Sequence, residues 1–109
     1  MNGYGNSVFL RTAWEVSSGA PVNTVAPAIT GTAQAGQTVT CSKGTWTGTP
    51  TITFAFQWKR NGVDIVLNAQ MQSYKLALAD VGQSITCQVT ATNGFGSSSA
   101  TSNTITPIP

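Results

Sequence analysis

Apolar and polar side chains alternate along much of the chain with a period of two, which is typical of β-strands that bury one face. Turn-forming Gly, Asn and Pro residues separate the alternating segments, and no segment of useful length has a helical period. The pattern therefore predicts an all-β fold. The strands are expected at residues 28–31, 37–42, 52–60, 63–67, 73–78, 83–92 and 97–106.

The inward faces of these strands define the expected core. Asn61-Gly62 predicts a tight hairpin, because both residues of such a turn take a positive φ. Asn93–Gly96 predicts a second hairpin, and the Pro-bounded residues 21–27 are expected to form a linker. The side chains expected to point inward are Val39, Cys41, Phe54, Phe56, Trp58, Tyr74, Leu76, Leu78, Ile85, Cys87, Val89 and Ala91.

Residues 7–16 form a further alternating segment ahead of this pattern, joined to it by residues 17–21. It is either an extra edge strand of the same domain or an arm that adds to another chain. We favour the arm, because an exposed Trp and Leu on a small monomer would form an adhesive patch. The expected organisation is an arm at 1–22 and a β-sandwich at 23–109. The expected partner interface is Val8, Phe9, Leu10, Trp14 and Val16.

Two cysteine-bearing strands with a tryptophan strand between them are typical of the pinned core of an immunoglobulin-type sandwich. Trp58 is expected in that core. Cys41 and Cys87 either form a disulfide or stay reduced as packed thiols, and we favour the disulfide. Closing so long a loop would add about 4 kcal/mol in the chain-entropy model. Structural disulfides are rare in the cytoplasm, however, and the start of the chain has no signal-peptide pattern.

Composition narrows the function classes. Only 7% of the residues are charged, well below the ~25% usual in soluble domains, whereas 40% are hydrophobic, so we expect a folded domain with a neutral, hydroxyl-rich surface. The net charge of +2 comes from five scattered bases, of which only Lys59 and Arg60 are adjacent. This argues against nucleic-acid binding. No segment is long and apolar enough to cross a bilayer, so no membrane partner is expected.

The residues that carry common chemistry are sparse. The chain has no histidine, and its three carboxylate side chains, Glu15, Asp64 and Asp80, lie on separate elements, where solvated or turn-bonding roles are expected. The two cysteines lack the partners that a zinc site or a catalytic thiol needs. We therefore expect no catalytic residue, no cofactor and no metal.

Two aromatic residues outside the expected core have separate expected roles. Trp46 is expected to plug the end of the sandwich. Phe95 is a candidate exposed contact residue at a hairpin tip, where binding residues often lie.

Four stretches in this order resemble a bacterial and bacteriophage immunoglobulin-like module: PAITGTAQAGQTVTC (27–41), GTWTG (44–48), FQWKRNGV (56–63) and YKLALADVGQSITCQVTATN (74–93). The similarity covers residues 21–109. Such modules occur on surface adhesins and on virion proteins of tailed phages, where they bind or act as spacers. Ile85 stands where antibody-type domains place a tyrosine, so Asp80 and Gly82 are expected to hold that corner instead.

The resemblance implies a small non-enzymatic virion protein. It would decorate or cement the capsid by binding the major capsid protein through the arm, and display the sandwich at the virion surface. Other virion proteins, copies of itself and host-surface glycans are further expected partners, and synthesis in the host cytoplasm is expected. The alternatives are a tail- or fibre-associated adhesion module and a carbohydrate-binding module of a secreted protein.

Overall fold

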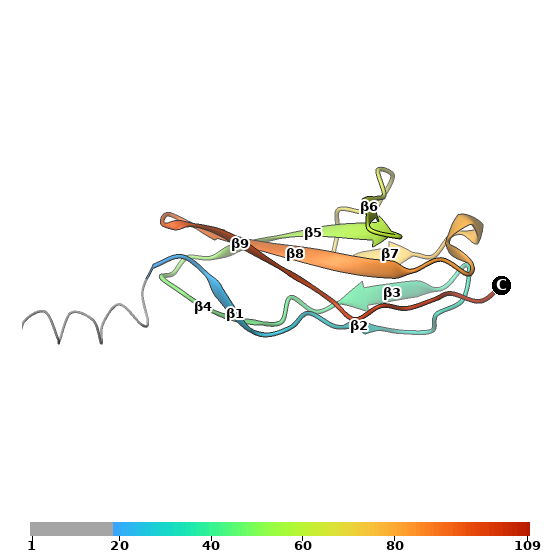
Figure 1. The fold of residues 1–109 in the computed structure, drawn as a ribbon, viewed down its shortest axis with the longest axis horizontal. Helices are drawn as coiled ribbons and strands as arrows, with labels where there is room; N and C mark the ends of the chain where they lie inside the picture. Colours follow the sequence, from blue (N-terminus) through green and yellow to red (C-terminus); the bar gives the residue numbers. More distant parts are fainter. Residues whose placement is uncertain (1–18) are drawn as a thin grey trace, which may run out of the picture.

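The computed structural model describes residues 19–109 and confirms an all-β fold (Figure 1). A single 3₁₀ turn, η1 (Leu78–Asp80), interrupts the strands of this part of the chain. The strands are β1 (Val22–Val25), β2 (Ile29–Thr30), β3 (Thr38–Cys41), β4 (Thr45–Thr47), β5 (Thr53–Arg60), β6 (Val63–Asp64), β7 (Ser73–Lys75), β8 (Ile85–Asn93) and β9 (Gly96–Thr101).

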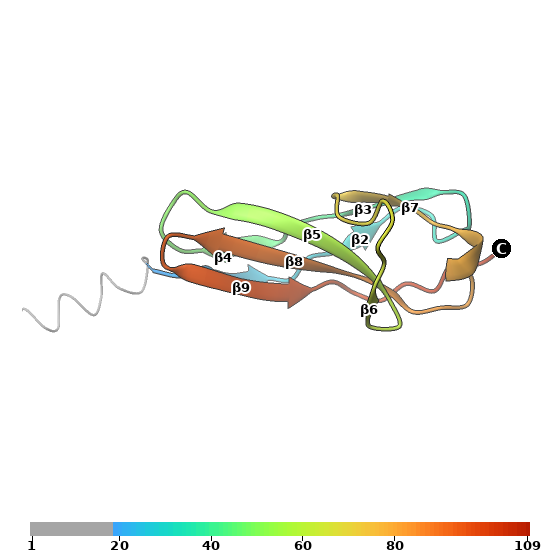
Figure 2. The same ribbon diagram turned by 90° about the horizontal axis from the view of Figure 1, so that it is seen from above.

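The strands form antiparallel sheets arranged as a sandwich. One sheet has the order β6-β5-β8-β9, a second has the order β2-β3-β7, and β1 pairs with β4. Figure 2 shows β5, β8 and β9 running side by side along the molecule. The long β5–β8 pairing extends from Thr53 opposite Thr92 to Arg60 opposite Ile85, and these two strands form the centre of the larger sheet.

The core lies between the sheets, where the alternation places it. Val39 and Cys41 of β3 are fully buried, and their strand neighbours Thr38 and Thr40 are exposed. From Ile85 to Ala91 of β8, every second side chain is fully buried in the same way. The fully buried members of β8 are Ile85, Cys87, Val89 and Ala91. Strand alternation therefore predicted these inward faces correctly.

The first hairpin has the turn that its sequence predicts. Asn61 and Gly62 adopt φ values of 53° and 82°, so both turn residues have the positive φ of a two-residue hairpin. In the second hairpin, Asn93 pairs with Gly96 across the turn, as expected.

The expected linker at residues 21–27 contains a strand instead. β1 pairs with β4 at the edge of the sandwich, and Pro21 and Pro27 flank it outside the ladder, where their missing N–H groups cost no hydrogen bond. Gly44 permits this approach, since a Cβ there would collide with the carbonyl oxygen of Val25. The proline-based prediction was therefore wrong for Val22–Val25.

Three predicted strands are shorter than their patterns suggested. β6 ends at Asp64 rather than at residue 67, and β9 ends at Thr101 rather than at residue 106. β7 ends at Lys75, so Leu78, which was expected to point inward, is 81% exposed. The chain turns out of the strand here because the backbone N–H of Ala77 donates to the Asp80 carboxylate (2.9 Å).

Candidate functional site

Trp58 joins the core to the segment that follows the first hairpin. Its side chain is fully buried, and its ring stacks on that of Tyr74 with 5.4 Å between centroids. The indole Nε1–H donates to the carbonyl oxygen of Met71 (2.8 Å). The tryptophan is therefore both a core side chain and an anchor for the loop that precedes β7.

Cys41 and Cys87 are two free, buried thiols in this structure, so the expected disulfide is absent and the reduced alternative applies. The neighbouring Cys41 thiol, together with burial, raises the pKa of the Cys87 thiol. Oxidation proceeds through the thiolate, and burial limits access by any oxidant. The pair consequently packs as small apolar side chains between β3 and β8.

Asp80 is fully buried at the centre of a polar network. Its Oδ1 accepts from Nε and Nη2 of Arg60 (both 2.7 Å), and its Oδ2 accepts from the Tyr74 hydroxyl (2.6 Å) and the Ala77 N–H (2.9 Å). The expected turn-bonding role of Asp80 is thus present, but a solvated one is not. Gly82 also holds this corner, by donating to the carbonyl oxygen of Pro107 (2.9 Å).

The network shifts the pKa values of its members, and the hydrogen bond to Asp80 raises that of Arg60. Burial alone would raise the pKa of Asp80, but the hydrogen bonds from Ala77, Tyr74 and Arg60 outweigh burial and lower it. Burial and the hydrogen bond to Asp80 raise the pKa of Tyr74 to about 12. At neutral pH, Asp80 is therefore a buried carboxylate and Tyr74 a neutral donor, which suits an architectural role.

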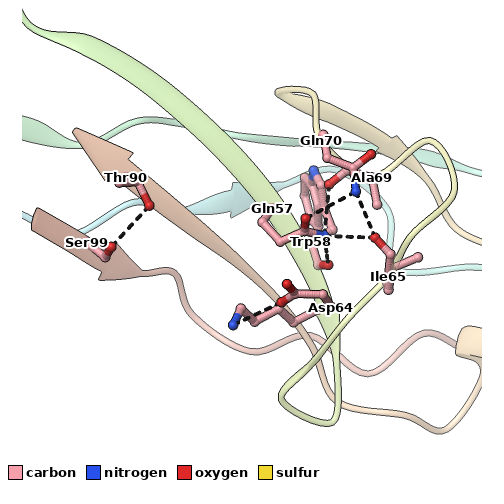
Figure 3. Close-up of polar contacts among 9 residues, drawn as sticks. Gln57, Trp58, Asp64, Ile65, Ala69, Gln70, Thr90 and Ser99 are labelled. Carbon is pink, nitrogen blue, oxygen red and sulfur yellow. Dashed lines mark hydrogen bonds and ion pairs between the residues drawn. The ribbon is translucent and has the colours of Figure 1, made fainter. Parts of the chain in front are cut away.

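A second set of amide contacts fastens the loop at residues 65–71 to β5 (Figure 3). The Gln57 Nε2 donates to the carbonyl oxygens of Trp58 (2.7 Å) and Ile65 (2.8 Å), and its Oε1 accepts from Gln70 (3.1 Å). The Trp58 N–H donates to Ala69 (2.8 Å), and the Ile65 N–H donates back to Trp58 (3.0 Å). The loop is therefore held at both ends.

Replacing Gln57 by alanine is expected to loosen this loop. The substitution removes the amide contacts, so the free energy of unfolding should fall by about 1–2 kcal/mol and exchange of the Ile65 amide hydrogen should accelerate. Gln88 faces Gln57 across β5 and β8, and its side chain makes no hydrogen bond within residues 19–109, so Gln88→Ala is the control. Hydrogen exchange monitored by NMR checks both variants. Equal exchange in the two would contradict the role of Gln57 in holding the loop.

A pocket of about 490 Å³ opens beside the Asp80 network. One wall is formed by residues 64–68, which comprise the end of β6 and the first part of the loop at residues 65–71. The other wall is formed by Tyr74, Lys75 and Ala77. Val66 and Leu67 on the loop wall are 79% and 75% exposed. Clustered exposed aliphatic side chains beside a pocket are typical of an interaction surface.

The described chain begins at the hairpin end of the larger sheet. The Gly19 N–H donates to the Thr49 hydroxyl (2.7 Å), and the Gly19 carbonyl accepts from Asn93 Nδ2 (2.8 Å) and from the Thr49 N–H (3.1 Å). Phe95, at the tip of the same hairpin, is 67% exposed, as its candidate contact role requires. The expected interface residues Val8, Phe9, Leu10, Trp14 and Val16 lie outside the described residues.

Trp46, on β4, packs against the edge of the core. Its half-buried ring lies 6.2 Å from that of Phe54, and its Nε1–H donates to the carbonyl oxygen of Lys43 (2.7 Å). Lys43 in turn places its ammonium 4.8 Å from the centre of the Phe54 ring. These contacts leave Trp46 as packing at the edge of the core.

Within residues 19–109, no His, Cys, Asp or Glu side chains gather in a group of three that could hold a metal ion. No helix of that part is long and apolar enough to cross a membrane. Comparison with known protein families, with characterised proteins and with solved structures finds no match to this chain. Any assignment of function therefore depends on the chain's own surfaces.

Sequence reasoning missed the pocket and its supports. Gln57 lies on the polar face of its strand, and no periodic signal separates it from Gln88 beside it. Tyr74 and Leu76 were placed inward correctly, but the ion pair of Arg60 with Asp80 spans twenty residues and depends on the turn that forms between them. The adjacent apolar residues Val66 and Leu67 were the one sequence signal for the pocket, but the pattern assigned them to the predicted strand at residues 63–67.

Proposed function

We propose that the protein is a non-enzymatic structural protein of a tailed-phage virion. It decorates the capsid by binding the major capsid protein through its N-terminal segment, and it displays an immunoglobulin-like sandwich at the virion surface. Binding by an extended arm that adds to another chain is a common mode of strand-based recognition.

One observation carries the proposal: the N-terminal segment joins the sandwich at the end that exposes Phe95. Gly19 is hydrogen-bonded to both Thr49 and Asn93, so the point from which residues 1–18 depart is fixed relative to that hairpin. The C-terminus lies at the opposite end of the molecule (Figure 1). One end thus combines the attachment segment with an exposed aromatic side chain, and the remainder is free for display.

The other surfaces of the sandwich agree with a display role. Hydroxyl groups line the outer face of β8 and β9, where Thr90 meets Ser99 (3.1 Å) and Thr92 meets Ser97 (2.9 Å). Asp64 pairs with Lys59 (3.1 Å) on the surface of the same sheet. A neutral, hydroxyl-rich face suits a domain that touches host-surface glycans, and a glycan-array screen tests that part.

Removal of residues 1–18 is expected to abolish binding to phage particles. The truncated chain keeps Gly19 and its contacts, and the full chain with Val8, Phe9 and Leu10 replaced by serine provides a second test if truncation impairs folding. Leu78→Ser, which removes an 81% exposed aliphatic side chain elsewhere, is the control and should bind normally. Co-sedimentation with purified particles measures the effect.

Normal binding by folded variants that lack the segment would refute the attachment role. Co-sedimentation with isolated tails but not with tailless heads would replace the capsid assignment by the tail-associated adhesion module. These outcomes are separable because heads and tails of one phage can be purified and tested with the same wild-type protein.

A further inference from the structure

The pocket lies between one edge strand of each sheet. β7 is the outer strand of one sheet and β6 is the outer strand of the other. Residues that line the pocket come from both of these edges, with Asp64 at the end of β6 and Lys75 at the end of β7. An extended peptide laid into this opening would meet a different wall on each of its faces.

The two walls differ in chemistry. The loop wall presents the exposed aliphatic side chains of Val66 and Leu67. The opposite wall includes the exposed residue Lys75, which carries an ammonium group. Of the four bases among residues 19–109, Lys59 and Arg60 pair with carboxylates and Lys43 lies over an aromatic ring, whereas Lys75 has neither kind of partner there.

The matching occupant is an extended segment with apolar side chains on one face and a carboxylate on the other. The two carboxylate side chains among residues 19–109, Asp64 and Asp80, already pair with bases. The third carboxylate of the sequence is Glu15, between Trp14 and Val16. In an extended segment, side chains alternate, so Trp14 and Val16 would face one wall and Glu15 the other.

The length of chain between Glu15 and Gly19 decides whether Glu15 can reach the pocket of its own sandwich or only that of a neighbouring copy. Gly19 is bound at the Asn93 end of β8, whereas the pocket residue Arg60 pairs with Ile85 at the other end. At about 3.3 Å per residue, the nine-residue β8 spans roughly 26 Å. The chain from Glu15 to Gly19 extends at most about 14 Å. Glu15 therefore does not reach the pocket of its own sandwich.

We propose that Trp14, Glu15 and Val16 of one copy occupy the pocket of a neighbouring copy, with Glu15 paired to Lys75. The contact is heterologous, because the segment and the pocket are different surfaces, so copies join in a staggered row. The proposal rests on the proposed function only in taking the N-terminal segment as the attachment element. It leaves Val8, Phe9 and Leu10 for the capsid protein.

Charge reversal in the full chain tests the pairing. Glu15→Lys and Lys75→Glu are each expected to weaken self-association roughly tenfold or more, and the double variant should return to within about threefold of wild type. Lys43→Glu makes the same charge change outside the pocket and should associate like wild type. Sedimentation equilibrium measures the association constants, and circular dichroism verifies that each variant is folded.

Three results would overturn the proposal: a wild-type chain that stays monomeric at millimolar concentration, equal weakening by Lys43→Glu and Lys75→Glu, or a double variant that stays as weak as the single ones. Particle binding is measured separately. Loss of self-association with normal co-sedimentation, or the converse, therefore assigns each failure to one proposal alone.

Discussion

Replacement of Asp80 by asparagine is expected to lower the free energy of unfolding by about 3 kcal/mol at neutral pH. The carboxylate is fully buried and accepts from Arg60, Tyr74 and the Ala77 N–H. Asparagine keeps the shape but removes the charge that Arg60 faces. The Arg60 side chain is 33% exposed, so water compensates in part and the loss falls at the lower end of the range for broken buried pairs. Urea denaturation measures it.

The same network predicts how stability depends on pH. The pKa of Asp80 is lowered in the folded protein, so its contribution is complete above the unfolded-state pKa of about 3.9 and is lost as the pH falls through the folded-state value. The pKa of Tyr74 is raised to about 12, so its contribution is complete below pH ~10 and is lost as the pH rises towards 12. The Asp80→Asn variant should lack the acid-dependent part.

Asp64→Asn is the matched control for this prediction. Asp64 also forms an ion pair, at 3.1 Å from Lys59, but its side chain is 59% exposed. Its removal should cost less than about 1 kcal/mol, because exposed pairs are solvated and screened. Equal losses for the two aspartates, or an unchanged acid limb in Asp80→Asn, would show that burial of the network does not govern stability.

Periodicity located the strands wherever one face is buried against the opposite sheet. Val39 and Cys41 on β3 and the inward side chains of β8 follow the alternation throughout, since a register shift of one residue would expose all of them. Val22–Val25 escaped prediction because an edge strand with mostly exposed side chains shows no such alternation. Local patterns thus predict strands that bury one face in the core and miss an edge strand whose side chains are mostly exposed.

The candidate site was beyond local patterns for a related reason. Val66 and Leu67 continue the apolar run that starts at Ile65. They are nevertheless exposed, because Gln57 and Trp58 hold the backbone at Ile65 and Ala69 against β5. These contacts determine that residues 65–67 form a loop and not a strand. They join residues several positions apart in the sequence, so a pattern of adjacent residues does not reveal them.

Trp58→Ala is expected to lower the free energy of unfolding by about 3–5 kcal/mol, the range for deleting a large buried aromatic side chain. The substitution empties the centre of the core beside Tyr74 and removes the bond to Met71. Trp46→Ala is the control. Its ring is half-buried at the core edge, so about 2 kcal/mol is expected. Equal losses at the two positions would contradict the central place of Trp58.

Trp58→Phe separates the two roles of this side chain. Phenylalanine keeps most of the ring packing on Tyr74 but has no N–H to donate to Met71, so a loss of about 1–2 kcal/mol is expected. Because that bond fixes the C-terminal end of the pocket loop, hydrogen exchange in residues 65–71 should accelerate and self-association should weaken while the fold persists. Normal exchange in this variant would mean that Gln57 holds the loop without help from the core.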